Sequence, residues 1–93
     1  MRIIGYVEHP TLKITIFKMD TRLSIKFEDN LYEQTYKFRM QEGLERLPDI
    51  QQLVDDAFLA AVRQQFSQME AISMSAQARH LPEREEEEFE DII

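Results

Sequence analysis

The sequence contains no cysteine, no tryptophan and only two glycines among its 93 residues. Without cysteine the chain has no disulfide bond, no thiolate ligand for a metal and no thiol nucleophile. Two isolated glycines do not make the glycine-rich loop that holds the phosphates of a nucleotide. A chain without cysteine also suits a reducing compartment, so we expect a cytoplasmic protein.

Long apolar runs are missing as well. In the stretch "MRIIGYVEHP" only about five apolar residues lie between Arg2 and Glu8, which is too short for the core of a signal peptide. Crossing a bilayer takes roughly 20 apolar residues in a row. The apolar fraction of 43% is typical of globular proteins. We therefore expect one small domain at 1–81 with a thin core and no membrane partner.

Negative charge is concentrated in the second half of the chain. The net charge is −7, made up of +1 over residues 1–47 (eight basic, seven acidic) and −8 over residues 48–93 (three basic, eleven acidic). Such a chain is repelled by nucleic-acid phosphates and by anionic lipids. We therefore expect no nucleic-acid partner.

The first half alternates apolar and polar residues with a period of two, the pattern of half-buried strands. We predict strands at about 2–8, 11–19, 22–28 and 31–39, joined as an antiparallel meander. Turn loops at Asp20–Thr21 and Asp29–Asn30 set the register. The predicted opposite pairs are Ile16 with Ile25 and Ile14 with Phe27 across the first turn, and Phe27 with Tyr32 and Leu23 with Tyr36 across the second. The same register leaves the polar Gln34 on the inner face without an explanation.

The register of the first strand determines which apolar side chains lie on the outer face of the sheet. The simplest register points Ile4 and Tyr6 outward, next to Phe17 and Met19, and these four residues form a predicted interaction patch. A register shifted by one residue would instead bury Ile4 and Tyr6. Gly5 inside a strand is typical of a bulge, of a close approach by another backbone, or merely of a weak point in an edge strand.

From about residue 49 to 80 the apolar spacing changes to that of an amphipathic helix, which Pro82 should end. A helix of that length spans roughly 47 Å, whereas the strands span about 25 Å. Its C-terminal part therefore overhangs the sheet and needs another surface to cover it. The predicted overhang comprises Phe66, Met69 and Ile72.

A homodimer would cover both surfaces, because a two-fold axis uses each patch twice. The alternative is a break in the helix near Ser67–Ser75, which would give two shorter helices folded back on one another. The predicted fold class is thus α+β: a four-stranded antiparallel meander with one long C-terminal helix on one face, followed by an acidic tail.

The tail at 82–93 carries seven acidic residues. Blocks of like charge are usually disordered and solvated. Pro82 and the acidic residues after it would also suit a short helix, with Phe89, Ile92 and Ile93 on one side. The tail is therefore a solvated segment, a latch on the lysine-bearing face of its own sheet, or a hook for another protein.

Residues for catalysis are scarce. We interpret His9 as a turn residue and His80 as a helix-end residue, with neither beside a nucleophile. The adjacent Asp55 and Asp56 do not face each other on a helix, as an acid–base pair would. No loop offers alternating oxygen ligands for calcium. We predict no catalytic residue, no metal and no cofactor.

The functional hypothesis is a non-enzymatic protein–protein interaction module that forms a homodimer. The alternative is a ligand-binding domain or enzyme with a pocket between sheet and helix, near Gln34 and Tyr36. Unpartnered polar groups on these two side chains would favour the pocket, and a closed core with both satisfied would count against it.

Overall fold

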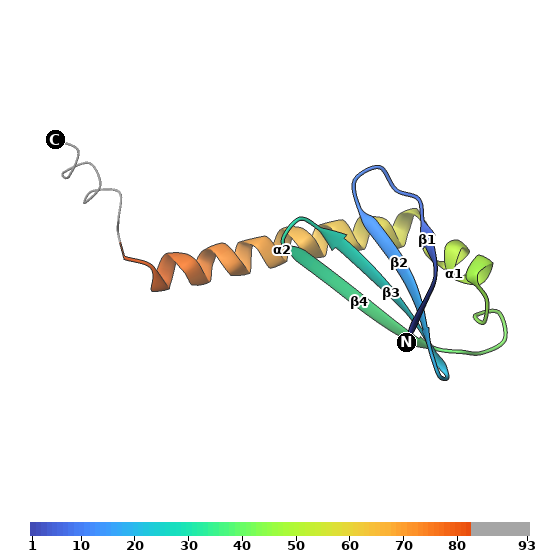
Figure 1. The fold of residues 1–93 in the computed structure, drawn as a ribbon. Helices are drawn as coiled ribbons and strands as arrows, with labels where there is room; N and C mark the ends of the chain where they lie inside the picture. Colours follow the sequence, from blue (N-terminus) through green and yellow to red (C-terminus); the bar gives the residue numbers. More distant parts are fainter. Residues whose placement is uncertain (83–93) are drawn as a thin grey trace.

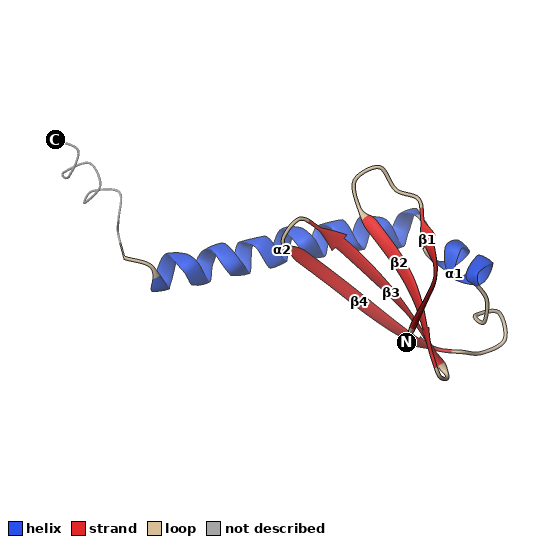
Figure 2. Cartoon of the chain, viewed as in Figure 1, coloured by secondary structure: helices blue, strands red, loops and turns tan. Residues whose placement is uncertain are grey.

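The computed structural model describes residues 1–82 and shows an α+β domain (Figure 1). Four antiparallel strands form one open sheet in the order β1-β2-β3-β4, and two helices follow. In Figure 2 the long helix crosses behind the sheet and continues beyond it. The predicted meander covered by a long helix is therefore confirmed. The elements are β1 (Arg2–Val7), β2 (Lys13–Met19), β3 (Arg22–Asp29), β4 (Tyr32–Arg39), α1 (Leu47–Leu53) and α2 (Asp56–His80).

The central hairpin has the predicted register, with Ile14 opposite Phe27 and Ile16 opposite Ile25. Its turn places Asp20 at a positive φ of 51°, which Asp tolerates better than most residues.

The β3–β4 hairpin is shifted by two residues from the prediction. Its loop is Asn30–Leu31, with Asn30 at a φ of 58°. Phe27 therefore pairs with Gln34 and not with Tyr32. A shift of two residues leaves every side chain on its predicted face, so the periodicity of the sequence does not distinguish the two registers.

A bulge in β1 changes which residue faces outward. Ile3 pairs with Phe17 and Gly5 pairs with Ile16, so Ile4 is the extra residue. Ile4 packs against the core, and its predicted outward position is wrong. The bulge coincides with a close approach, because a Cβ on Gly5 would lie 2.7 Å from both terminal methyls of Leu47. The glycine thus lets α1 pack closely on β1.

The predicted helix at 49–80 is in fact two helices, separated at Val54 and Asp55. Asp55 adopts an extended conformation, and its Oδ1 accepts a hydrogen bond of 2.9 Å from the Phe58 amide. It is therefore the N-cap of α2, because it satisfies one of the free amides of the first turn. After this break α2 runs unbroken through Ser67–Ser75, so the alternative of a break there is not what the structure shows.

A second aspartate organises the start of α1. Asp49 Oδ2 accepts hydrogen bonds of 3.0 Å from the backbone amides of Glu45 and Arg46. These two bonds, first that from Glu45 and then that from Arg46, hold the pKa of Asp49 below its ordinary value because they favour the ionised carboxylate.

The core lies between the inner face of the sheet and the two helices. Its aromatic centre is Phe27, whose ring centroid lies 5.8 Å from that of Tyr36 and 5.2 Å from that of Phe58. Such edge-to-face and tilted contacts are favourable for aromatic rings. The buried apolar residues are Leu12, Ile14, Ile16, Leu23, Ile25, Phe27, Ile50, Val54, Val62 and Phe66.

Gln34 links the sheet to α2. Its Nε2 donates a hydrogen bond of 2.9 Å to the carbonyl oxygen of Val62, and its Oε1 accepts one from the hydroxyl of Tyr36. A buried amide needs such partners. The polar residue on the inner face therefore fixes where α2 crosses β4.

Candidate interaction surfaces

The C-terminal part of α2 extends past the sheet, on the side of β4 (Figure 1). Val62 and Phe66 are buried, and Met69 is half-buried against the core. The predicted overhang therefore begins too early: Phe66 is only 5% exposed and belongs to the core. We call residues 70–80 the distal segment of α2.

Large apolar side chains are exposed on the distal segment. Ile72 is 66% exposed and Met74 is 61% exposed, and Leu81 just beyond the helix is exposed as well. Two residues apart on a helix, Ile72 and Met74 point about 200° from each other, so one flat surface does not cover both. Met74 was missed in the sequence because it does not fall on the apolar stripe that continues from the core.

The outer face of the sheet carries the second apolar surface, which we call the outer patch. Tyr6 is 54% exposed, and Phe17 and Met19 are half-buried, as the sequence predicted for an outward position. The bulge in β1 replaces the predicted Ile4 with Ile3, which is 51% exposed and lies opposite Phe17. The signal for this exchange was Gly5, a glycine inside a strand.

The β3–β4 side of the same face is charged. Lys26 Nζ lies 3.1 Å from Glu33 Oε2 and 3.8 Å from Glu28 Oε1. The hydrogen bond with Glu33, followed by the charge of Glu28, raises the pKa of Lys26 above its ordinary value. Arg22 and Arg39, of like charge, are direct cross-strand neighbours at the other end of the two strands. The outer face thus joins an apolar half on β1 and β2 to a charged half on β3 and β4.

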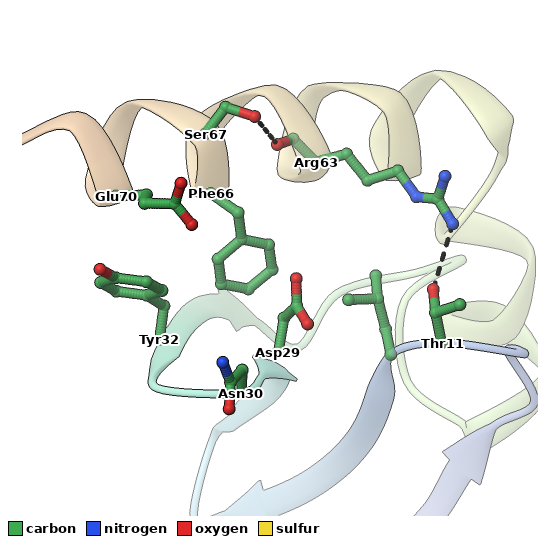
Figure 3. A pocket seen from close by; sticks show the side chains of 9 residues that line it. Thr11, Asp29, Asn30, Tyr32, Arg63, Phe66, Ser67 and Glu70 are labelled. Atoms are coloured by element: carbon green, nitrogen blue, oxygen red, sulfur yellow. Dashed lines mark hydrogen bonds between the residues drawn. The ribbon is translucent and has the colours of Figure 1, made fainter.

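A groove of 540 Å³ opens between α2, the β1–β2 loop and the β3–β4 turn (Figure 3). Arg63 Nη2 donates a hydrogen bond of 3.2 Å to Thr11 Oγ1 at one end of it. Glu70 and Asp29 add carboxylates of the same sign, and Phe66 forms an apolar wall. The groove therefore has mixed polarity and lacks the enclosed apolar lining of a typical ligand site.

This groove is not the pocket proposed as the alternative. Gln34 and Tyr36 do not line it, and both have protein partners in the core. In the described part of the chain, no buried side-chain nitrogen or oxygen lacks a hydrogen-bond partner. By the criterion set from the sequence, the satisfied core counts against a pocket at these residues.

The histidines lie apart. His9 Nδ1 accepts hydrogen bonds from the amides of Thr11 at 3.2 Å and of Leu12 at 3.1 Å, and so shapes the β1–β2 loop. His80 is in the last turn of α2. Within residues 1–82, no three His, Cys, Asp or Glu side chains are grouped as metal ligands, and no helix has the length and apolarity to span a bilayer.

The tail predictions for Phe89, Ile92 and Ile93 lie outside the described residues. Comparisons with protein-family models, with curated proteins and with solved structures found no match for this chain.

Proposed function

We propose that this chain is a small non-enzymatic module that acts through protein–protein contacts, and that it binds a second copy of itself. The observation that carries the proposal is the distal segment of α2, which continues past the sheet and exposes Ile72 and Met74. Large apolar side chains that stay exposed on an element projecting from the domain favour an interface. A two-fold axis would bring two such segments together.

The free energy gained by burying the distal segments can be compared with the cost of association. Complete burial of a large apolar side chain contributes about 1.5–3 kcal/mol. Because Ile72 and Met74 point in opposite directions, one contact buries only one of them from each copy; with Leu81 this makes at most four partly covered side chains, which contribute about 4–8 kcal/mol. Association costs about 4–15 kcal/mol in lost freedom. The distal segments alone therefore give a marginal dimer, and a second contact has to contribute.

The compartment is part of the proposal. Since the chain has no cysteine, it gains nothing from an oxidising environment, and we place it in the cytoplasm.

Light scattering after gel filtration tests self-association over a range of chain concentrations. We expect twice the chain mass of 11.1 kDa, falling toward 11.1 kDa on dilution. A version that ends at Leu81 should behave in the same way, because the surfaces that carry the proposal lie before that residue. A mass of 11.1 kDa for both versions at every concentration would contradict the proposal.

A further inference from the structure

The two edges of the sheet differ in how they are protected. β1 has six residues and is interrupted by the bulge at Ile4. Gln51 of α1 donates a hydrogen bond of 3.3 Å to the Tyr6 carbonyl oxygen, which occupies a backbone acceptor of β1. β4 has eight residues in unbroken register with β3. An uninterrupted edge strand is a ready template for another strand, so β4 is the edge that can accept one.

The hydrogen-bond pattern shows which backbone groups of β4 are available. The residues that flank a two-residue hairpin loop form a hydrogen-bonded pair, and such pairs alternate with non-bonded ones along antiparallel strands. Asp29 and Tyr32 are the flanking pair here. The bond of 2.9 Å from the Met40 amide to the Thr21 carbonyl oxygen continues the same alternation at the far end. The even-numbered residues of β4 therefore bond to β3, and the odd-numbered ones direct their amides and carbonyls to the open edge.

The side chains of those odd-numbered residues are self-complementary. Glu33, Thr35 and Lys37 are exposed and follow one another on the outer face of β4. If two such strands run antiparallel with Thr35 at the centre, each Glu33 lies opposite a Lys37. Opposite-charge pairs and Thr–Thr pairs are both favourable across antiparallel strands.

We propose that β4 pairs with β4 of a second copy, antiparallel and about a two-fold axis at Thr35, to form a continuous eight-stranded sheet. This inference rests on the proposed function, because it names the second contact of the same dimer. The distal segment of α2 projects on the β4 side of the domain (Figure 1), where the second copy is added. One assembly thus uses both the open edge and the exposed helix.

Other registers are less favourable. An axis at Glu33 or at Lys37 places two like charges directly opposite each other, which is destabilising. An axis at Tyr36 pairs Glu33 with Arg39, but it also places the buried amide of Gln34 opposite Phe38. With the axis at Thr35, Gln34 lies opposite Tyr36, the residue type that already donates to it within the chain.

A single cysteine tests this register on a background without other thiols. Residues directly opposite in a hydrogen-bonded pair have Cα atoms about 5.5 Å apart, within the Cα range of a disulfide, whereas diagonal neighbours at about 7–8 Å lie beyond it. After mild oxidation we expect most of the Thr35→Cys chain to run as a covalent dimer on a non-reducing gel. The matched control is Thr21→Cys, an exposed threonine in the β2–β3 turn, which should stay largely monomeric.

The outcomes separate the two proposals. If Thr35→Cys has dimer mass by light scattering but cross-links no more than Thr21→Cys, strand pairing at Thr35 is wrong and self-association stands. If the unmodified chain is a monomer at every concentration, both proposals fail.

A charge exchange provides a second readout that needs no disulfide. Lys37→Glu should weaken the dimer at least about tenfold, because the new glutamate of each copy then lies opposite Glu33 of the other copy. Adding Glu33→Lys to the same chain should recover part of that loss, although it also replaces the carboxylate that lies 3.1 Å from Lys26 Nζ with a like charge. No weakening by the single change, or no recovery by the double change at equal thermal stability, would overturn the register.

Discussion

Replacing Phe27 with alanine removes most of the stability of the domain. Phe27 is fully buried and packs against Tyr36 and Phe58 at the centre of the core. Phe-to-Ala changes at such sites cost about 3–5 kcal/mol, since they lose buried surface and leave a cavity. The total stability of a domain is about 5–15 kcal/mol, and a thin core is at the lower end. Urea unfolding followed by circular dichroism should show a partly or wholly unfolded Phe27→Ala chain.

The control for this change is Phe17→Ala, because Phe17 is the same residue type on the outer face of the sheet. Phe17 is half-buried, and it lies on the face of the sheet opposite to the core that α1 and α2 cover. We expect Phe17→Ala to lower the free energy of unfolding by less than half as much as Phe27→Ala. Both variants are measured at the same chain concentration, so that dimerisation contributes equally. Equal losses would show that the covered face of the sheet has been misassigned.

The second large effect is on association. Ile72→Glu should weaken the dimer by at least about 30-fold, because each copy loses the burial of a partly covered apolar side chain, worth about 1–2 kcal/mol, and the two-fold symmetry doubles this loss. Ile72 is 66% exposed in the single chain, so the fold itself should be unaffected. Glutamate is also at least as good a helix former as isoleucine. Sedimentation velocity over a dilution series measures the dissociation constant.

Gln64→Glu is the matched control on the same helix. Gln64 is exposed and belongs to the part of α2 that packs on the sheet, before the distal segment. Its replacement by glutamate adds the same single negative charge. The control should leave the dissociation constant within about threefold of the unmodified value, since exposed charges contribute little. A similar loss in both variants would mean that net charge, and not the distal segment, controls association.

The sequence predicts the β2–β3 hairpin well for a physical reason. Its two strands alternate strictly, and its turn has the two polar residues Asp20 and Thr21. A shift of one residue would expose the whole apolar face, so burial alone selects the register. In β3–β4 the competing registers differ by two residues, which burial does not separate. The polar pair Asp29–Asn30 therefore predicts a loop one residue before the observed loop at Asn30–Leu31.

The remaining differences are local events that periodicity does not encode. The bulge at Ile4 was signalled only by Gly5. The end of α1 was signalled only by Asp55, a good N-cap residue that the apolar spacing places inside one continuous helix. The overhang was predicted from the length of the helix alone, and the structure shows an overhang that starts later than predicted. The helix that crosses the sheet begins at Asp56 and not at residue 49, so Phe66 still lies over the sheet and packs in the core.

The central claim is that a second copy covers the distal segment of α2. Hydrogen–deuterium exchange measures this directly, in peptides that cover residues 70–80, at chain concentrations above and below the dimer dissociation constant. We expect these amides to exchange more slowly at the high concentration, while the amides around the buried Val62 and Phe66 keep the same rate. Equal exchange of residues 70–80 at both concentrations, with a dimer present at the higher one, would contradict the account.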